Sequence, residues 1–260
     1  NRQSHSQLSL LKLDFHSIRA ISGRIRIGGI AMGPFPHDAP PAKITEQNPA
    51  GTDGFEFVEF AHENPAKLEE LFGKMGYAKV ATHKTKAISV WRQGDINYII
   101  NAEPGSHAMK FVDLHGPCAA SMAWRVVDAR HAFEHAVSKG ATPYEGDDKA
   151  LDVPAIVGIG GSLLYFVEKY GAKGSAYDAE FNWTGAKDPK PKGVGFYFLD
   201  HLTHNVYRGN MDKWWAFYRD LFGFTQIHFF DIDRLVRLDV LHGLQHHVVA
   251  RHWVRNPGGH

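Results

Sequence analysis

The sequence predicts an α+β fold of tandem βαβββ modules, two of them complete and a third partial. Three observations carry this prediction. A strand, a helix, a glycine stop and further short strands follow one another three times along the chain. Each helical stretch places its apolar residues on one face. The 260 residues are 43% hydrophobic and 22% charged, which is enough for one large or two modest globular domains.

The first module, residues 53–105, opens with an alternating strand at 55–60. Asn64 is expected to cap the next helix, and Pro65 occupies its first position. Gly76 ends this helix, because glycine adopts the left-handed conformation at low cost. Three more strands are predicted at 77–82, 87–92 and 97–102.

The second module, residues 118–170, repeats the order. A strand at 121–127 leads to Asp128 as a helix cap, and Gly140 stops the helix. Strands are predicted at 142–145, 155–159 and 163–168. The glycine-rich segment 158–161 lacks a following helix and a Lys-Ser/Thr pair, so we interpret it as a turn rather than a phosphate loop.

The third unit begins with a strand at 195–206 and a helix with Trp214, Phe217, Tyr218, Leu221 and Phe222 on one face, ended by Gly223. Its helical spacing indicates a core stripe rather than a substrate cage. We expect part of this face to lie exposed, because the module is incomplete. A strand is predicted at 224–230, and none after residue 232.

Four segments follow from this pattern. Residues 1–52 are expected to be a non-native leader and a flexible, proline-rich arm, with a basic stretch at 1–31 that also resembles a transit peptide. Residues 53–181 form an N-terminal two-module domain. Residues 182–195 are a polar linker. Residues 196–260 begin a C-terminal metal-binding domain that diverges after residue 232.

Composition narrows the class of partner and compartment. The net charge of +1 gives no nucleic-acid footprint, and no apolar run approaches the roughly 18–20 residues of a membrane span. Cys118 is the only cysteine, which excludes an intramolecular disulfide framework. We therefore expect a cytoplasmic protein that binds neither nucleic acid nor membrane.

Specific runs of residues resemble a known superfamily. They are Gly54–Phe60, Tyr165–Glu168, Tyr177-Asp178 and, above all, Asp200-His201-Leu202-Thr203-His204-Asn205-Val206-Tyr207-Arg208-Gly209. With the module order, these runs are similar to the vicinal-oxygen-chelate superfamily, and within it to the 4-hydroxyphenylpyruvate dioxygenases. The resemblance covers residues 32–232.

The resemblance implies an Fe(II) enzyme with a metal-free first domain and a second domain that holds iron through two histidines and one carboxylate. His201 matches the first of these ligands. The implied substrates are a small aromatic 2-oxo acid, 4-hydroxyphenylpyruvate, and O₂. The implied products are homogentisate and CO₂, in tyrosine catabolism. We expect a homo-oligomer and, in this chain, the whole first domain with less than half of the second.

The sequence leaves the other candidate ligands open. The second histidine and the carboxylate of the family are expected beyond the third module's helix. The run Gly243-Leu244-Gln245-His246 echoes the family's second ligand, but we expect a coincidence because too few residues separate it from His201. His204, three residues along a strand from His201, is expected to point to the opposite face and not to bind the same ion. Glu168 is expected to be a surface carboxylate at a strand end.

Two other functions remain as alternatives. A hydroxymandelate synthase-type dioxygenase would use the same substrate and iron. A non-catalytic fragment would act as a folding or oligomerisation module, and metal binding that depends on His201 would discriminate against it.

Overall fold

The computed structural model describes residues 41–199, 201–207 and 209–225, and the backbone of residues 246–250. The described residues from Ala42 onward belong to one compact unit. The first module comprises β1 (Thr52–Ala61), α1 (Pro65–Lys74), β2 (Ala78–His83), β3 (Ile88–Gln93) and β4 (Ile96–Asn101). Helix α2 (His107–His115) leads to the second module, with β5 (Cys118–Val126), α3 (Ala129–Ser138), β6 (Ala155–Val157), the turn η3 (Ile159–Gly161) and β7 (Leu163–Val167). The turn η4 (Gly171–Lys173), β8 (Phe181–Trp183), β9 (Leu202–Val206), α4 (Met211–Phe222) and β10 (His246–Ala250) follow.

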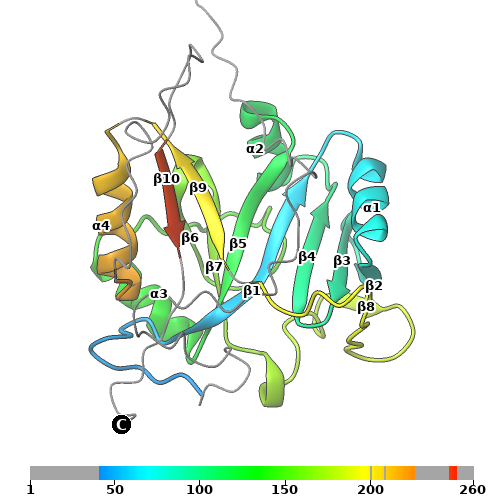
Figure 1. Ribbon diagram of the computed structural model, residues 1–260, viewed down its shortest axis with the longest axis horizontal. Helices are drawn as coiled ribbons and strands as arrows, with labels where there is room; N and C mark the ends of the chain where they lie inside the picture. The colour runs from blue at the N-terminus through cyan, green and yellow to red at the C-terminus, as the bar shows by residue number, and fades with distance from the viewer. Residues whose placement is uncertain (1–40, 200, 208, 226–245, 251–260) are drawn as a thin grey trace, which may run out of the picture. The chain divides into compact units, whose positions relative to one another are not determined.

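Eight strands form one sheet in the order β6-β7-β5-β1-β4-β3-β2-β8 (Figure 1). In each module the first strand pairs in parallel with the last, β1 with β4 and β5 with β7. The two first strands pair with each other in antiparallel orientation. This arrangement confirms the predicted tandem βαβββ fold, because each module closes on its own first strand before it joins its neighbour.

The sequence predicts two capping residues, and the side chain of one of them, Asp128, makes the capping hydrogen bond. Asp128 precedes α3, and its carboxylate accepts a hydrogen bond from the backbone N–H of His131 at 2.9 Å. Asn64 precedes α1, with Pro65 at the first position, but the Asn64 side chain makes no capping hydrogen bond. Gly76 follows the end of α1 with a φ of 84°, a conformation that a β-carbon would strain.

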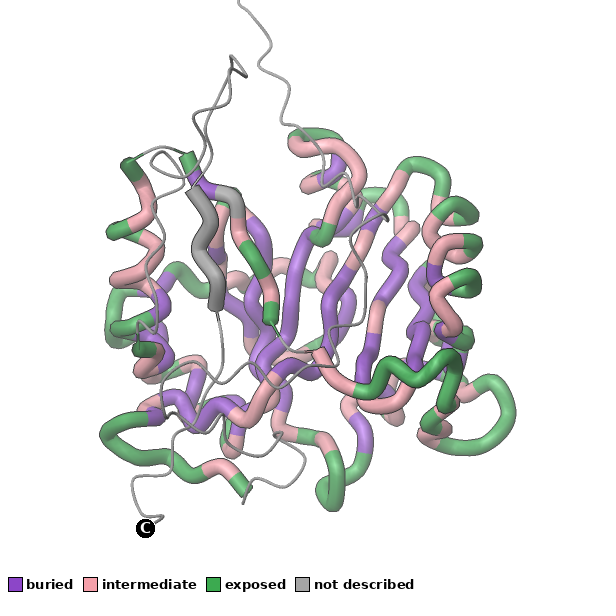
Figure 2. Tube along the Cα trace, viewed as in Figure 1, coloured by how far each residue is buried: buried purple, intermediate pink, exposed green. Residues whose placement is uncertain are grey.

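Apolar residues pack on both faces of the sheet, and the central strands are buried along most of their length (Figure 2). We call one set the inner core; it includes Phe57, Val90, Ile99, Tyr165 and Tyr177. We call another the outer core; it lies under α3 and includes Trp124, Phe166 and Ala132. Smaller clusters lie under α1 and α2. The inner core fills the face between the modules, with Tyr177 fully buried.

The helix of the third unit joins the outer core. Tyr218, Leu221 and Phe222 of α4 are buried there, and the ring centroids of Trp124 and Phe222 lie 5.6 Å apart. The stripe is therefore core, as predicted. The expectation that this face lies exposed is wrong, because the second module supplies the apolar surface that covers it.

Strand β9 differs from β1 and β5 in its partner. It pairs in antiparallel orientation with β10, so that Leu202 lies opposite Ala250 and Val206 opposite His246. No strand was predicted in this late region. Within the described residues, β9 and β10 form a two-stranded sheet of their own.

Other differences from the predicted elements have local causes. The strand expected at 142–145 is only an isolated bridge between Pro143 and Ile156, since proline has no N–H to donate to a ladder. The strand expected at 195–206 begins at Leu202. Most of the strand expected at 224–230 lies outside the described residues. Helix α2 and the three-residue strand β8 were not predicted.

Candidate metal centre at the start of β9

His201 stands immediately before β9, and its side chain is exposed. Its neighbour in sequence, Leu202, is half-buried and packs against the outer core. Asp200 lies outside the described residues. The strand therefore holds the backbone next to His201, while the side chain of His201 is accessible from solvent.

His204 is engaged elsewhere. Its Nε2 lies 3.1 Å from the hydroxyl of Tyr218, within hydrogen-bonding distance, and the two ring centroids are 5.8 Å apart. Burial lowers the pKa of His204 to about 4, so its imidazole is neutral near pH 7. The arrangement supports the prediction that His204 packs between β9 and α4 rather than binding an ion with His201.

The register of β10 separates His246 from His201, the two histidines whose sequence surroundings resemble iron-ligand motifs of the family. His246 lies opposite Val206, at the far end of β9 from His201. Five residues of strand span roughly 17 Å, whereas two ligands of one ion lie only a few ångströms apart. This spacing supports the interpretation that the echo at 243–246 is a coincidence.

Glu168, at the end of β7, has a structural partner. It is half-buried, and its Oε2 accepts a hydrogen bond from the backbone N–H of Ala129 at 3.0 Å, in the first turn of α3. A carboxylate at a helix N-terminus is stabilised by the unpaired amides there. The expected simple surface position is wrong, because Glu168 completes the cap of α3 beside Asp128.

A buried carboxyl that the sequence does not reveal lies in the inner core. Glu59 of β1 is 1% exposed. It hydrogen-bonds to the hydroxyl of Ser121, and the amide of Asn101 donates to its Oε1 at 2.7 Å. Burial raises the pKa of Glu59, although these hydrogen bonds act in the opposite direction. Because both oxygens are occupied, this cluster acts as an internal polar network.

A second network lies toward the other end of β1. Glu56 forms an ion pair with Arg125 at 2.6 Å and accepts a hydrogen bond from Asn97. The same Asn97 accepts from the Nε of Arg92 at 2.5 Å. These charges are mutually satisfied, so the first domain presents no free acid or base on its inner face at this point.

Iron needs three protein ligands close together in the family that the sequence resembles. Among the residues that the structure describes, no group of three histidine, cysteine, aspartate or glutamate side chains could hold a metal ion. His201 is therefore the single implied ligand within this part of the chain. The described residues do not by themselves fit an iron site, so no reaction step is assigned to a metal here.

Two βαβββ modules joined through antiparallel first strands define the chain as a vicinal-oxygen-chelate protein. A family model described as "Hydroxyphenylpyruvate dioxygenase, HPPD, N-terminal" matches residues 46–182. This match covers more than half of the chain, which therefore belongs to the hydroxyphenylpyruvate dioxygenase N-terminal family.

Individual proteins support the same family. Hemolysin VllY of Vibrio vulnificus (strain CMCP6) is 48% identical over 193 residues, which cover 72% of this chain and 54% of the relative. The 4-hydroxyphenylpyruvate dioxygenase of Pseudomonas sp. (strain P.J. 874) is 46% identical over 188 residues, covering 72% of this chain and 53% of the relative. The chain thus spans about half the length of these curated relatives.

A solved structure agrees with the fold. The xylose isomerase-like TIM barrel/4-hydroxyphenylpyruvate dioxygenase fusion protein superposes with a TM-score of 0.61 at 31% identity, over 72% of this chain and 29% of that one. Separately, none of the helices within the described residues is long and apolar enough to cross a membrane.

Proposed function

We propose that this chain belongs to an Fe(II)-dependent dioxygenase that converts 4-hydroxyphenylpyruvate and O₂ to homogentisate and CO₂. The observation that carries the proposal is the 46% identity to the Pseudomonas 4-hydroxyphenylpyruvate dioxygenase over 72% of the chain. In this proposal residues 53–181 are the metal-free domain, 182–195 the linker, and 196–260 the start of the metal-binding domain. The sites and the domain limits are proposals of the same kind.

His201 is proposed as one iron ligand. Its exposed position before β9 supports this role, and the engagement of His204 with Tyr218 argues against the other nearby imidazole. The remaining ligands of a facial triad would come from outside the described residues. The part of the chain that the structure describes would then position one ligand and the body of the first domain.

The compartment and the assembly are also proposed. A single cysteine, Cys118, supports a cytoplasmic location, because one cysteine forms no intramolecular disulfide of the kind found in oxidising compartments. A homo-oligomer is proposed from the family resemblance. Sedimentation equilibrium of the purified chain measures that state directly.

The experiment that tests the function uses the purified 260-residue chain loaded anaerobically with Fe(II). Bound iron and oxygen uptake with 4-hydroxyphenylpyruvate are measured for the unsubstituted chain, for His201→Ala and for His62→Ala. His62 is a matched control because it is a histidine of the first module, where its Nδ1 accepts a hydrogen bond from the backbone of Asn64. We expect His201→Ala to lose bound iron and His62→Ala to retain it.

The outcomes separate the proposals. Equal iron binding by all three chains contradicts the ligand role of His201. Iron binding without oxygen uptake keeps the metal site and contradicts catalysis by this chain. If the unsubstituted chain binds no iron and takes up no oxygen, that result favours the alternative of a folding or oligomerisation module.

A further inference from the structure

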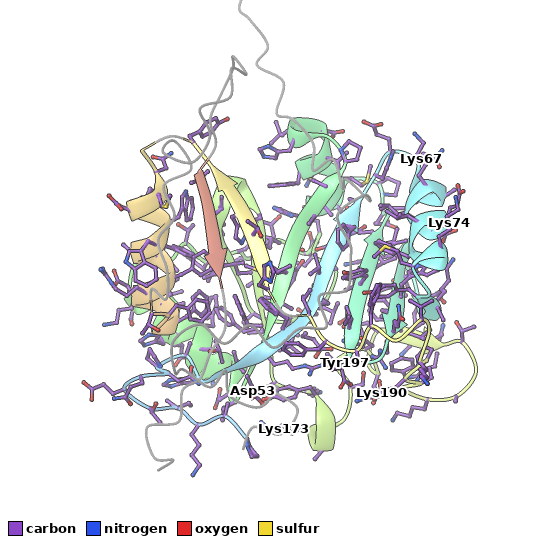
Figure 3. The ribbon with its side chains drawn as sticks, in the orientation of Figure 1. Asp53, Lys67, Lys74, Lys173, Lys190 and Tyr197 are labelled. Atoms are coloured by element: carbon purple, nitrogen blue, oxygen red, sulfur yellow. The ribbon has the colours of Figure 1, made fainter. Side chains whose placement is uncertain are left out.

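The segment between β8 and β9, residues 184–199, lies along the first module; we call it the strap. Most of its residues are exposed (Figure 2), yet its backbone is fixed to the turn between β3 and β4. The N–H of Gly94 donates to the carbonyl of Pro191 at 2.8 Å, and the N–H of Asp95 donates to the carbonyl of Tyr197 at 3.1 Å. Figure 3 shows Lys190 and Tyr197 of the strap near this turn. A segment predicted as a linker is thus attached along its length.

Gln93 is the central attachment. It is the last residue of β3 and is fully buried. Its Nε2 donates to the carbonyl of Met75 at 2.8 Å, while its Oε1 accepts from the N–H groups of Gly195 at 2.9 Å and Phe196 at 3.1 Å. One amide therefore joins the end of α1 to two successive residues of the strap. Only a side chain with a donor and an acceptor at this length makes all three bonds.

Glycines bring the two backbones into direct contact. Gly94 has a φ of 57°, and a β-carbon on it would lie 2.6 Å from the Cα of Tyr197. Gly193 has a φ of 52°, and a β-carbon there would lie 2.5 Å from the Cδ of Gln93. Both separations are well inside van der Waals contact, so these positions accept glycine only. The fit of the strap against the first module is specific on both sides.

Arg92 provides a second attachment earlier in the strap. Its Nη1 donates to the carboxylate of Asp188 at 2.7 Å and to the carbonyl of Pro189 at 3.0 Å. Its side chain is buried, whereas that of Asp188 is 40% exposed. Neighbouring residues of β3 therefore hold both halves of the strap.

These attachments constrain the residues that follow. His201 follows Tyr197 by four Cα-to-Cα steps, which span about 14 Å at most in a fully extended chain. Leu199 at the end of the strap and Leu202 on the other side of His201 both pack against the outer core. His201 is thus exposed, but the backbone that leads to it is fixed by the first module as far as Tyr197 and then by the outer core.

We propose that Gln93 is a positioning residue that fixes, through the strap, where His201 and β9 begin relative to the first module. The proposal rests on the proposed function only in the meaning given to His201 as an iron ligand. The attachment of the strap itself does not depend on that function.

The test compares three variants in the full chain by NMR. Gln93→Leu removes all three hydrogen bonds, and Gly193→Ala keeps the Gln93 side chain but places a β-carbon against its amide, which separates the strap from β3. Phe72→Leu is the control, because Phe72 is the buried residue of α1 in the same module and makes none of the strap contacts described above. The measurements are hydrogen exchange of the Gly195 and Phe196 amides and the imidazole resonances of His201. Gln93→Glu serves as the conservative variant, since it keeps the acceptor for both amides.

We expect Gln93→Leu and Gly193→Ala to speed exchange of these two amides about tenfold and to shift the His201 resonances. Phe72→Leu should lower the unfolding midpoint and leave both readouts unchanged, and Gln93→Glu should keep most of the protection. Unchanged His201 resonances in Gln93→Leu and Gly193→Ala would overturn the proposal, as would amide exchange no faster than in Phe72→Leu.

A titration of the unsubstituted chain with Fe(II) keeps the two claims apart. Paramagnetic broadening of the His201 resonances reports the proposed ligand role. A chain that shows no broadening contradicts that role, while the effect of Gln93→Leu on the strap is measured without metal and decides the positioning separately.

Discussion

The first two modules and the third unit begin alike and end differently. Each starts with a strand, continues with an amphipathic helix and stops at a glycine of positive φ, such as Gly76 and Gly223. In the first two modules the opening strand pairs with the module's own last strand. Strand β9 instead pairs with β10, and α4 packs against the second module.

The difference teaches that the same local pattern reaches stability by different routes. A sheet of eight strands with apolar faces stabilises itself, whereas a two-stranded sheet is marginal alone in water. The third unit obtains its apolar partner from Trp124 and Phe166 of the outer core. Substitutions in the outer core therefore affect β9 and α4 more than substitutions under α1.

The largest effect is expected from Trp124→Ala. The indole is fully buried and contacts Phe55, Phe222 and Phe224, so its removal should cost about 3–5 kcal/mol of unfolding free energy and release α4. Trp91→Ala is the matched variant in the first module, where Trp91 packs against Phe72. Urea unfolding and limited proteolysis at α4 should show release in the first variant only. Equal proteolysis of α4 in both would contradict the comparison.

A pH effect of up to about 3 kcal/mol is expected from His204. Its folded-state pKa, about 4, lies below the ordinary value of 6.5, so the unfolded chain takes up the proton first as pH falls. Stability is therefore present above pH 6.5 and lost between 6.5 and 4. Urea unfolding at pH 7.5 and 4.5 should show a smaller loss in His204→Gln than in the unsubstituted chain or His62→Gln. Parallel losses in all three would exclude His204 as the cause.

Glu59 should give a pH dependence of opposite sign in the first two modules. Because burial raises its folded-state pKa, the folded chain holds the proton more tightly, and stability falls as pH rises above the ordinary value of 4.5. Glu59→Gln cannot ionise, so its stability relative to the unsubstituted chain should increase from pH 5 to pH 8. Calorimetric melting at both pH values measures this change. A constant difference would mean that Glu59 does not titrate in that range.

The smallest effect separates the helix caps of the first two modules. Asp128→Ala should cost about 1 kcal/mol, since the carboxylate caps the N–H of His131. Asn64→Ala should cost much less, because the Asn64 side chain makes no such bond. Urea midpoints of the two variants test the difference. A larger loss of stability in Asn64→Ala than in Asp128→Ala would show that Asn64, and not Asp128, is the stabilising cap.

The repeat and the helices α1, α3 and α4 follow from patterns that the sequence displays directly, whereas the parallel pairing of first and last strands does not. Gly76, Gly140 and Asp128 mark helix ends through conformational preferences that act locally. The three-residue strand β8 and the bridge at Pro143 could not be predicted, because they depend on neighbours distant in sequence. Helix α2 buries only Ala108 and Val112, too few positions for a clear periodic signal.

The buried carboxyls show a further limit. An alternating reading of β1 places Glu56 and Glu59 on opposite faces, so that only one of them would be buried. Register shifts between Phe55 and Phe57, and between Glu59 and Phe60, break that alternation and leave both glutamates buried. For the candidate site, the motif around His201 is local and can be read from the sequence. The attachment of the strap through Gln93 depends on tertiary contacts and cannot be predicted from the sequence.

The central claim is that the first two modules close on themselves whereas β9 depends on its neighbours. Native-state hydrogen exchange of the unsubstituted chain tests it most directly. Amides of β1 and β5 are expected to exchange only by global unfolding, and those of β9 to exchange at least a hundredfold faster through local opening. Amides of β9 as slow as those of β5 would contradict it.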